Sequence, residues 1–303
     1  MMRILRFAVI GHPVAHSASP AMHGAVFRAL GLSHTYEAVD CPGRPAVEAA
    51  LGLVRRGGIA GLNVTAPHKR LVVELADRVD SSVSEVGAAN TLVRDGDDRV
   101  VAYNTDVPAL VDELERLAPR QATAMILGAG GAASAALAAC RSYGMRVVGV
   151  TTRSWPTSEA VYEDATAEAF RARGALTLPW PSGDRGTGSR LSSALRLQWL
   201  DLAAAADLVI QATSVGVRDP NAPDLDGVIP WAELSPSAVA LDLVYGPRPT
   251  AFLVAARARV EKAENGLGML VGQGARALAL WLGIDAPRDV MAAAVRRKLS
   301  ESA

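Results

Sequence analysis

The stretch that most restricts how this chain folds lies at residues 122–144 and reads ATAMILGAGGAASAALAACRSYG. An apolar run of strand length is followed by a glycine-rich turn and then by an alanine-rich run of helical length. Within the turn, Gly128 and Gly130 have G-x-G spacing, and Ala133 stands where a third glycine is often found. Such glycines let backbone N–H groups at a helix N-terminus approach a pyrophosphate. We therefore expect a strand–turn–helix unit that binds a dinucleotide, in preference to a turn that serves packing alone.

The end of the next expected strand, RVVGVT at 146–151, indicates which dinucleotide is bound. No Asp or Glu occurs between Glu115 and Glu159, so the carboxylate that usually holds an NAD ribose is missing. The chain instead reads TTRS, in which Arg153 can make a charge-assisted bidentate contact with a 2′-phosphate. An exposed loop arginine without a ligand is the alternative. The missing acid and Arg153 together favour NADP over NAD.

Strand-like and helix-like runs alternate along the first part of the chain. Such alternation predicts an α/β domain with a mainly parallel sheet, here followed by a hairpin-like pair of runs joined by a charged turn. The expected strands are 6–11, 35–40, 61–65, 90–95 and 98–104, and the expected helices are 20–32, 44–58, 70–79 and 106–119.

A second α/β domain with a doubly wound nucleotide-binding pattern is expected from residue 122 onward. Its further strands are 146–151, 206–213 and 238–245. Residues 154–200 are rich in Pro, Gly, Ser and Arg, and we interpret them as a surface excursion. The final segment, from residue 266, is helical and need not belong to the domain that precedes it.

Composition limits the partners that are expected. The chain has 303 residues with 31 Lys plus Arg and 31 Asp plus Glu, so no net charge attracts nucleic acid or an anionic membrane. No apolar run is long enough to cross a bilayer or to form a signal-peptide core. Cys41 and Cys140 lack C-x-x-C spacing, which suits a reducing compartment. We expect a cytoplasmic protein, a monomer or homodimer, that binds a small molecule and neither nucleic acid nor membrane.

The segment GHPVAHSASPAMH at 11–23 follows the first expected strand. Alternate residues of an extended segment face the same side, so Ser17 and Ser19 can offer two hydroxyl groups to one anionic group. Ser19 is also a suitable N-cap for a helix that begins at Pro20, and the two roles are compatible. Three histidines in the segment suggest a metal, but no acidic residue precedes Glu37, and we expect no metal site.

Lys69 ends the stretch NVTAPHK at 63–69, directly before the expected helix at 70–79. A lysine at the start of a helix lies against the positive end of the helix dipole, where an acidic residue is normally preferred. Helix chemistry therefore does not explain Lys69, and we expect another interaction to favour it.

Eight short blocks, taken together, resemble the shikimate dehydrogenase family. They follow the family's order and span nearly the whole chain: HSASP at 16–20, NVTAPHK at 63–69, GAANTL at 87–92, NTD at 104–106, GAGGA at 128–132, ATSVG at 212–216, DLVYGPRPTAFL at 242–253 and NGLGMLVGQGA at 265–275. The resemblance implies a substrate domain of residues 1–106 and 266–303, which the C-terminal helices rejoin, and a Rossmann-type NADP domain at 107–265. It also implies reversible, NADP-dependent reduction of 3-dehydroshikimate to shikimate, in chorismate and aromatic amino-acid biosynthesis.

The resemblance also implies roles for single residues. Lys69 and Asp106 match the family's catalytic pair. We assign proton transfer to Lys69, whereas Asp106 orients Lys69 and hydrogen-bonds a substrate hydroxyl. Ser17 and Ser19 match carboxylate-binding serines. Residues around the ring hydroxyls and carboxylate correspond to Asn63, Thr65, Asn90, Tyr245 and Gln273. Cofactor contacts correspond to Gly128, Ala129, Gly130, Gly131, Ala132, Thr152, Arg153 and Ser154, with Leu243 and Gly266 beside the nicotinamide.

Some positions depart from the family's usual pattern. The block Thr152, Arg153, Ser154 replaces Asn-Arg-Thr, and a second arginine that commonly follows has no counterpart, which predicts a weaker preference for NADP. Val107 stands where Gly is frequent, His12 replaces a frequent Asn, and the 154–200 region is longer than usual. None of these changes removes a catalytic residue.

Two other functions remain open from the sequence alone. A quinate or aminoshikimate dehydrogenase of the same superfamily binds a similar ring, whose substituents the sequence does not fix. A non-enzymatic sensor of shikimate-pathway metabolites needs no proton donor, so the presence of both Lys69 and Asp106 counts against it. Zero net charge and the lack of a basic helix-turn-helix extension count against a DNA-binding form.

Overall fold

The computed structural model describes residues 4–181, 193–217, 225 and 228–301. The chain divides into two compact units, one formed by residues 1–109 with 267–303 and the other by residues 110–266. Each unit combines helices with one six-stranded sheet. The expected fold class, two α/β units, is therefore confirmed.

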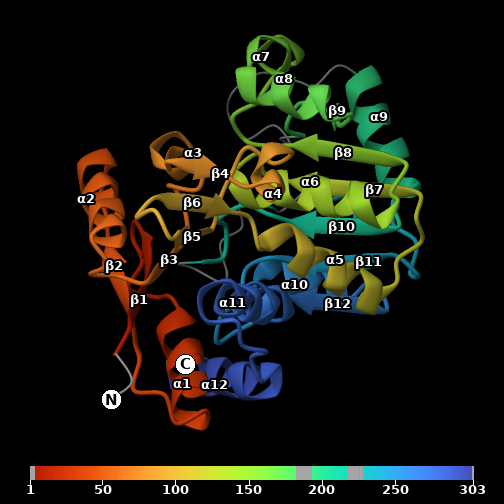
Figure 1. Cartoon of the computed structure of the whole chain (residues 1–303). Coiled ribbons are helices and arrows are strands. Elements are labelled where there is room, and N and C mark those ends of the chain that lie inside the picture. Colours follow the sequence, from red (N-terminus) through yellow and green to blue (C-terminus); the bar gives the residue numbers. More distant parts are fainter. Residues whose placement is uncertain (1–3, 182–192, 218–224, 226–227, 302–303) are drawn as a thin grey trace. The chain divides into compact units, whose positions relative to one another are not determined.

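The first unit has a mixed sheet in the order β2-β1-β3-β5-β6-β4 (Figure 1). β1 pairs in parallel with β2 and β3, and β4 pairs in parallel with β6. β5 is antiparallel to both of its neighbours, and β5 and β6 form the expected hairpin. The strands are β1 Arg6–Gly11, β2 Thr35–Asp40, β3 Gly61–Val64, β4 Arg78–Val79, β5 Thr91–Arg94 and β6 Val100–Tyr103.

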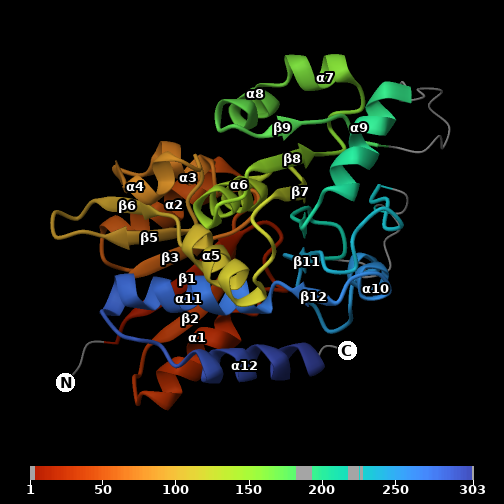
Figure 2. The same ribbon diagram turned by 90° about the vertical axis from the view of Figure 1, so that its right-hand side faces the viewer.

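The helices of this unit come from both ends of the chain. α12 lies beside α1 and α11 (Figure 2), so the C-terminal helices return to the unit that holds the N-terminal residues. In α2 the apolar residues Val47, Leu51 and Val54 recur at helical spacing and are buried in the core. The helices are α1 Ser19–Ala29, α2 Arg44–Arg55, α3 Leu71–Leu75, α4 Ser81–Ser84, α11 Leu267–Leu282 and α12 Arg288–Ser300, while α5, Asp106–Leu117, begins here and continues into the second unit.

The second unit has a sheet in the order β12-β11-β10-β7-β8-β9, with every pairing parallel. The strand order reverses between β7 and β10, which is the doubly wound arrangement expected from the sequence. In such a sheet a ligand binds outside the carboxyl ends of the strands at the reversal. The strands are β7 Thr123–Leu127, β8 Val147–Thr151, β9 Leu176–Thr177, β10 Leu208–Gln211, β11 Val239–Asp242 and β12 Lys262–Asn265.

The expected surface excursion at 154–200 contains regular structure. Two helices and the edge strand β9 follow β8, and residues 182–192 of the excursion lie outside the described residues. The buried Trp155 and Phe170 pack edge to face in this part, with ring centroids 6.3 Å apart. The helices of the second unit are α6 Gly131–Tyr143, α7 Ser158–Glu163, α8 Ala165–Ala172, α9 Ser193–Ala204 and α10 Ala251–Arg257.

The prediction of a helix over residues 70–79 is wrong beyond the first turn. α3 ends at Leu75, and Arg78 and Val79 form the short strand β4 beside β6. Asp77 causes the change, because its N–H donates to the carbonyl of Val100 at 2.9 Å and its carboxylate accepts the Val100 N–H at 2.8 Å. These two bonds to a strand replace the bonds that would continue the helix.

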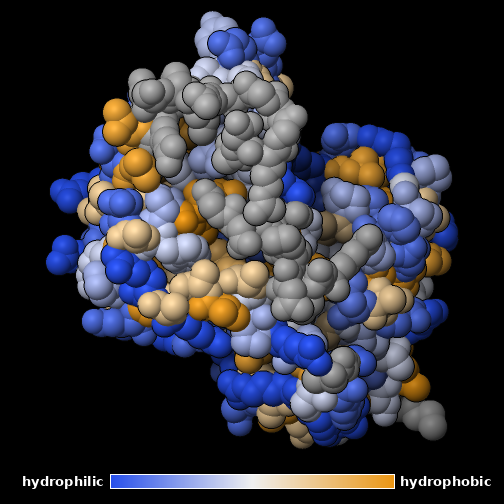
Figure 3. All heavy atoms as spheres, turned by 180° about the vertical axis from the view of Figure 1, so that it is seen from behind, coloured by the Kyte–Doolittle hydropathy of each residue, from blue (hydrophilic) through white to orange (hydrophobic). Residues whose placement is uncertain are grey.

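Among the described residues, no helix has both the length and the apolar character needed to span a bilayer. On the face shown in Figure 3, hydrophobic residues lie in small separate groups among hydrophilic ones. Exposed large apolar side chains include Tyr162, Leu197 and Val254. Single exposed apolar residues are usual on folded proteins, so these residues do not by themselves indicate a partner.

Candidate active site

The first unit brings Lys69 and Asp106 into direct contact. Lys69 Nζ lies 2.6 Å from Asp106 Oδ2, and the two side chains are 16% and 4% exposed. Lys69 lies in the turn between β3 and α3, two residues before the helix begins. Two further contacts fix this turn, because the Lys69 carbonyl accepts the N–H of Ala89 at 2.8 Å and His68 Nε2 lies 2.6 Å from the carbonyl oxygen of Cys41. A carbonyl only accepts, so that histidine nitrogen carries a proton. The partner expected for Lys69 is the carboxylate of Asp106.

Asp106 is the first residue of α5, and its position is fixed from two sides. Asn104 Oδ1 accepts the backbone N–H groups of Asp106 and Val107 at 3.0 and 3.1 Å, which satisfies two donors at the start of the helix. A carboxylate in the first turn is favoured by the helix dipole. Asn90 Nδ2 donates to Asp106 Oδ1 at 2.9 Å, so each carboxylate oxygen has its own donor.

Asn90 joins Asp106 to Gln273 of α11. The backbone N–H of Thr105 donates to Asn90 Oδ1 at 2.7 Å, which directs Nδ2 toward Asp106. Gln273 Oε1 lies 3.4 Å from the same nitrogen, whose two hydrogens have closer acceptors in Asp106 Oδ1 and Thr105 Oγ1, both at 2.9 Å. Asn90 and Gln273 are 2% and 8% exposed. Two residues predicted to contact substrate therefore lie in one hydrogen-bonded group with the Lys69–Asp106 pair.

Asn63 and Thr65 lie at the end of β3. The Asn63 amide is 4% exposed and bonds to Tyr36, to the Asn90 carbonyl and to a threonine of β5. Thr65 is half-buried, and its backbone N–H donates to the carbonyl of Ile10 at 2.8 Å. The end of β1 and the end of β3 are thereby held side by side.

Ser17 and Ser19 lie at the start of α1. The backbone N–H of Ser19 donates to Ser17 Oγ at 3.2 Å; Ser17 is half-buried and Ser19 is 5% exposed. The expected N-cap role of Ser19 is wrong, because Ala18 is the cap and already accepts the N–H of Met22 at 3.0 Å. The helix begins one residue earlier than expected, and the Ser19 hydroxyl is not used in a cap.

In the second unit, the turn between β7 and α6 has a backbone that requires glycine and leaves the first turn of the helix uncovered. Gly128 has φ +114°, and a Cβ there would lie 2.8 Å from the carbonyl oxygen of Ala212, so only glycine fits. Gly130 is the N-cap of α6 and provides no side-chain cap, and a Cβ there would meet nothing within 4 Å. Gly131 and Ala132 begin the helix, and Ala129 lies half-buried in the turn. The open first turn of α6 fits a dinucleotide phosphate.

Arg153 lies at the tip of a tight turn after β8. The Thr152 carbonyl accepts the N–H of Trp155 at 3.0 Å, and Arg153 and Ser154 are exposed between them. Trp155 is completely buried and so fixes the turn. Trp155 was not identified from the sequence, although an aromatic residue directly after the TTRS block was visible there.

The expected nicotinamide and ring contacts of the second unit follow β11 and β12. A Cβ at Gly266 would lie 2.4 Å from the Leu243 carbonyl oxygen, so the two backbones touch. Tyr245, two residues after Leu243, is half-buried. Asp242, the last residue of β11, directly precedes Leu243 and was not singled out in the sequence. Its carboxylate accepts the N–H of Val244 at 3.0 Å and the hydroxyl of Thr250, and burial raises the pKa of Asp242 to about 6.

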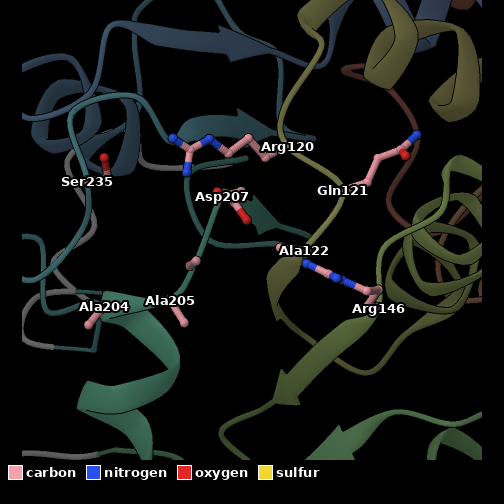
Figure 4. A pocket seen from close by; sticks show the side chains of 9 residues that line it. Arg120, Gln121, Ala122, Arg146, Ala204, Ala205, Asp207 and Ser235 are labelled. Atoms are coloured by element: carbon pink, nitrogen blue, oxygen red, sulfur yellow. The ribbon is translucent and has the colours of Figure 1, made fainter.

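A cavity of about 540 Å³ lies elsewhere in the second unit (Figure 4). Its lining includes Ala122, Arg146 and Asp207, which directly precede β7, β8 and β10. It therefore opens at the amino ends of the strands, away from the carboxyl ends where the glycine turn lies. It contains none of the expected site residues.

A metal ion has no evident ligand set in the described part of the chain, where no group of three His, Cys, Asp or Glu side chains comes together. His12 Nδ1 lies 2.9 Å from Asp40 Oδ2 in an exposed pair. His23 is completely buried, and its two ring nitrogens have no hydrogen-bond partner. Burial lowers the pKa of His23 to about 3, so the ring is neutral at pH 7.

Known proteins match this chain over almost all of its length. Residues 9–92 match the shikimate dehydrogenase substrate binding domain, and residues 266–296 match the shikimate 5′-dehydrogenase C-terminal domain. Shikimate dehydrogenase (NADP(+)) of Thermus thermophilus is 37% identical, over 98% of this chain and 99% of the relative. The enzyme of the same name from Desulforamulus reducens is 34% identical, over 97% of this chain and 95% of the relative.

The fold of this chain also matches a solved structure of a shikimate dehydrogenase. The crystal structure of shikimate 5-dehydrogenase from Thermus thermophilus in complex with NADP(H) and shikimate aligns with a TM-score of 0.79 at 35% identity, covering 98% of this chain and 100% of that chain. The resemblance first drawn from eight sequence blocks is confirmed by these full-length matches. This chain therefore belongs to the shikimate dehydrogenase family.

Proposed function

We propose that the protein catalyses the reversible, NADP-dependent reduction of 3-dehydroshikimate to shikimate, an oxidoreductase step of chorismate and aromatic amino-acid biosynthesis. The observation that carries the proposal is the 2.6 Å contact between Lys69 Nζ and Asp106 Oδ2 in a largely buried position. Relatives support the proposal, because two proteins named shikimate dehydrogenase (NADP(+)) are 34% and 37% identical to this chain over nearly its whole length.

Lys69 is the proposed proton donor. Reduction of a carbonyl leaves negative charge on its oxygen, so a donor must lie within hydrogen-bond reach of that oxygen. An ammonium group has three N–H donors, and Asp106 accepts one of them. In the proposed reaction another is directed to the substrate oxygen, and in the reverse direction the amine takes the proton back. NADP, when bound, supplies the hydride.

Asp106 orients Lys69 and accepts a hydrogen bond from a substrate hydroxyl. Its two oxygens have about four lone-pair sites in all. Lys69 and Asn90 use one site on each oxygen, so acceptor capacity is left for the substrate. The proposed carboxylate contacts are Ser17 and Ser19, and the proposed ring contacts are Asn63, Thr65, Asn90, Gln273 and Tyr245.

For the cofactor we propose NADP. The glycine turn from Gly128 to Ala132 would hold the pyrophosphate, Thr152, Arg153 and Ser154 would hold the 2′-phosphate, and Leu243 and Gly266 would flank the nicotinamide. The open first turn of α6 and the exposed position of Arg153 after β8 support this assignment. The first unit would accordingly bind the substrate and the second the cofactor.

We further propose a cytoplasmic monomer or homodimer. Cys41 and Cys140 are both buried and free, which suits a reducing compartment. Quinate or aminoshikimate as the main substrate, and a sensor without activity, are less favoured because the named relatives are shikimate dehydrogenases.

The test is a substrate panel. Purified protein is assayed by NADPH or NADH absorbance with shikimate, quinate and aminoshikimate, each with NADP and with NAD. We expect the highest kcat/KM for shikimate with NADP. A higher value for quinate or aminoshikimate would reassign the substrate, and no turnover with any pair would support the sensor function instead.

A further inference from the structure

A hydrogen-bond chain leads from the half-buried Tyr36 of β2 through buried side chains toward the Lys69–Asp106 pair. Tyr36 Oη donates to Asn63 Oδ1 at 2.7 Å. Asn63 Nδ2 donates to the Asn90 carbonyl at 3.2 Å and to Thr91 Oγ1 at 3.1 Å. Both hydrogens of this amide nitrogen and its oxygen are therefore engaged with protein groups.

The orientation of the Asn63 amide follows from its partners. The Asn90 carbonyl can only accept a hydrogen bond, so the amide atom facing it must be the nitrogen. The amide oxygen then faces Tyr36, whose hydroxyl must be the donor. A rotated amide would place two acceptors against each other in a buried site. Tyr36 thus contributes the donor that completes the only arrangement without a repulsive contact.

From Asn63 the chain continues to Asp106 through the end of β5. Thr91 Oγ1 lies 3.3 Å from Asn90 Oδ1 and 3.1 Å from Thr105 Oγ1. Asn90 Nδ2 in turn donates to Thr105 Oγ1 and to Asp106 Oδ1, both at 2.9 Å. Asn63 therefore holds both the backbone of Asn90 and the threonine that lies against the Asn90 amide.

Tyr36 is itself held by a stacked ring. His23 of α1 lies parallel to it, with centroids 4.2 Å apart and an interplanar angle of 11°. His23 is completely buried and uncharged at pH 7 because burial lowers its pKa to about 3. The stack fixes the ring plane and so fixes where the tyrosine hydroxyl lies.

We infer that Tyr36 and Asn63 are positioning residues of the reaction, which fix Asn90 and through it the carboxylate of Asp106. This role adds to the substrate contact expected for Asn63 from the family resemblance, because both amide hydrogens are bonded to protein while Oδ1 keeps one lone pair beside its bond from Tyr36. The inference rests on the proposed function, since its readout is turnover of shikimate. It predicts a loss in kcat and no change in the KM for NADP.

The test compares two tyrosines that each donate one hydrogen bond to a distant part of the chain. Tyr36→Phe keeps the ring and removes the donor to Asn63. Tyr143→Phe removes a donor to the Pro119 carbonyl, at 2.9 Å in the second unit, and is the matched control. We expect Tyr36→Phe to lower kcat about tenfold, the effect of one hydrogen bond, and Tyr143→Phe to keep the wild-type value. Thermal unfolding of both variants separates this effect from loss of stability.

A double-mutant cycle tests whether Tyr36 acts through Asn63. We expect Asn63→Ala to lower kcat and Tyr36→Phe to have no further effect in that background. Equal kcat for the two tyrosine variants, or independent losses in the double variant, would overturn the inference. Wild-type turnover of shikimate with NADP is measured first, and its absence would instead contradict the proposed function.

Discussion

Lys69 and Asp106 are 37 positions apart in the chain, yet Nζ and Oδ2 lie 2.6 Å from each other. Lys69 lies in the turn that follows β3, and Asp106 begins α5 shortly after β6. The lysine that helix chemistry left unexplained is thus paired with a carboxylate from a neighbouring part of the same unit. Each of these largely buried charges needs the other as a partner, because either charge alone would be costly to bury.

Asp106→Asn tests the orienting role of the carboxylate. The amide has nearly the same shape but cannot attract the ammonium group as a charge, so we expect kcat to fall on the order of a hundredfold. The control is Asp98→Asn, at an exposed turn residue with φ 61°, a conformation that asparagine tolerates. Steady-state rates with shikimate and NADP provide the measurement. Equal losses in the two variants would contradict a specific role for Asp106.

Arg153→Ala tests recognition of the 2′-phosphate. We expect the KM for NADP to rise while the KM for NAD changes little, because only NADP carries the group that Arg153 is proposed to bind. Arg146→Ala is the control, since Arg146 directly precedes β8 whereas Arg153 follows it. An unchanged ratio of the two KM values would remove Arg153 from the cofactor site.

His23 makes folding sensitive to acid. Its folded pKa of about 3 lies below the ordinary value of 6.5, so between these values the unfolded chain binds a proton that the folded chain does not. Stability from the neutral ring is complete above the upper value and is lost as pH falls, by an amount on the order of 5 kcal/mol. In urea unfolding, His23→Phe should lack this loss. His16→Gln, at an exposed histidine, should retain it, and identical pH profiles in all three proteins would refute the role.

Asp242 has the opposite dependence. Its folded pKa of about 6 lies above the ordinary 3.8, so the folded chain binds the extra proton and stability falls as pH rises through this window, by about 3 kcal/mol. Asp242→Asn removes the titration and can still accept the Val244 N–H, so we expect it to lack this fall. Because the Asp242 and His23 windows overlap with opposite slopes, wild-type protein shows only their sum. A fall of the same size in Asp242→Asn would show that another group causes it.

Local patterns predicted what local chemistry determines. The glycines at 128 and 130, the strand before them and the helix after them are set by backbone freedom and apolar periodicity, and the structure has them where expected. The prediction of a helix over 70–79 was wrong because Asp77 bonds to Val100, 23 residues away, and a local sequence pattern does not include so distant a contact. β12, KAEN, was missed because an edge strand with polar residues lacks the apolar run that marks a buried one.

The candidate site also divides into residues that the sequence predicted and residues that only tertiary contacts reveal. Lys69 and Asp106 could be proposed from sequence blocks, and the structure places them in contact. Tyr36, Trp155 and Asp242 could not, because each acts by a hydrogen bond or by burial that depends on tertiary packing. The resemblance grouped Asn63 with substrate contacts, and the coordinates add that both of its amide hydrogens are bonded to protein.

The most direct test of the proposed mechanism is the steady-state turnover of Lys69→Ala with shikimate and NADP, measured beside wild type together with the dissociation constant for NADP. General acid–base groups contribute roughly 10²–10⁴-fold, so we predict a loss of kcat within or above that range with NADP binding nearly unchanged. Lys262→Ala, which removes an ammonium group bonded to the Leu117 carbonyl in the second unit, should keep wild-type turnover. Wild-type turnover in Lys69→Ala would contradict the central claim.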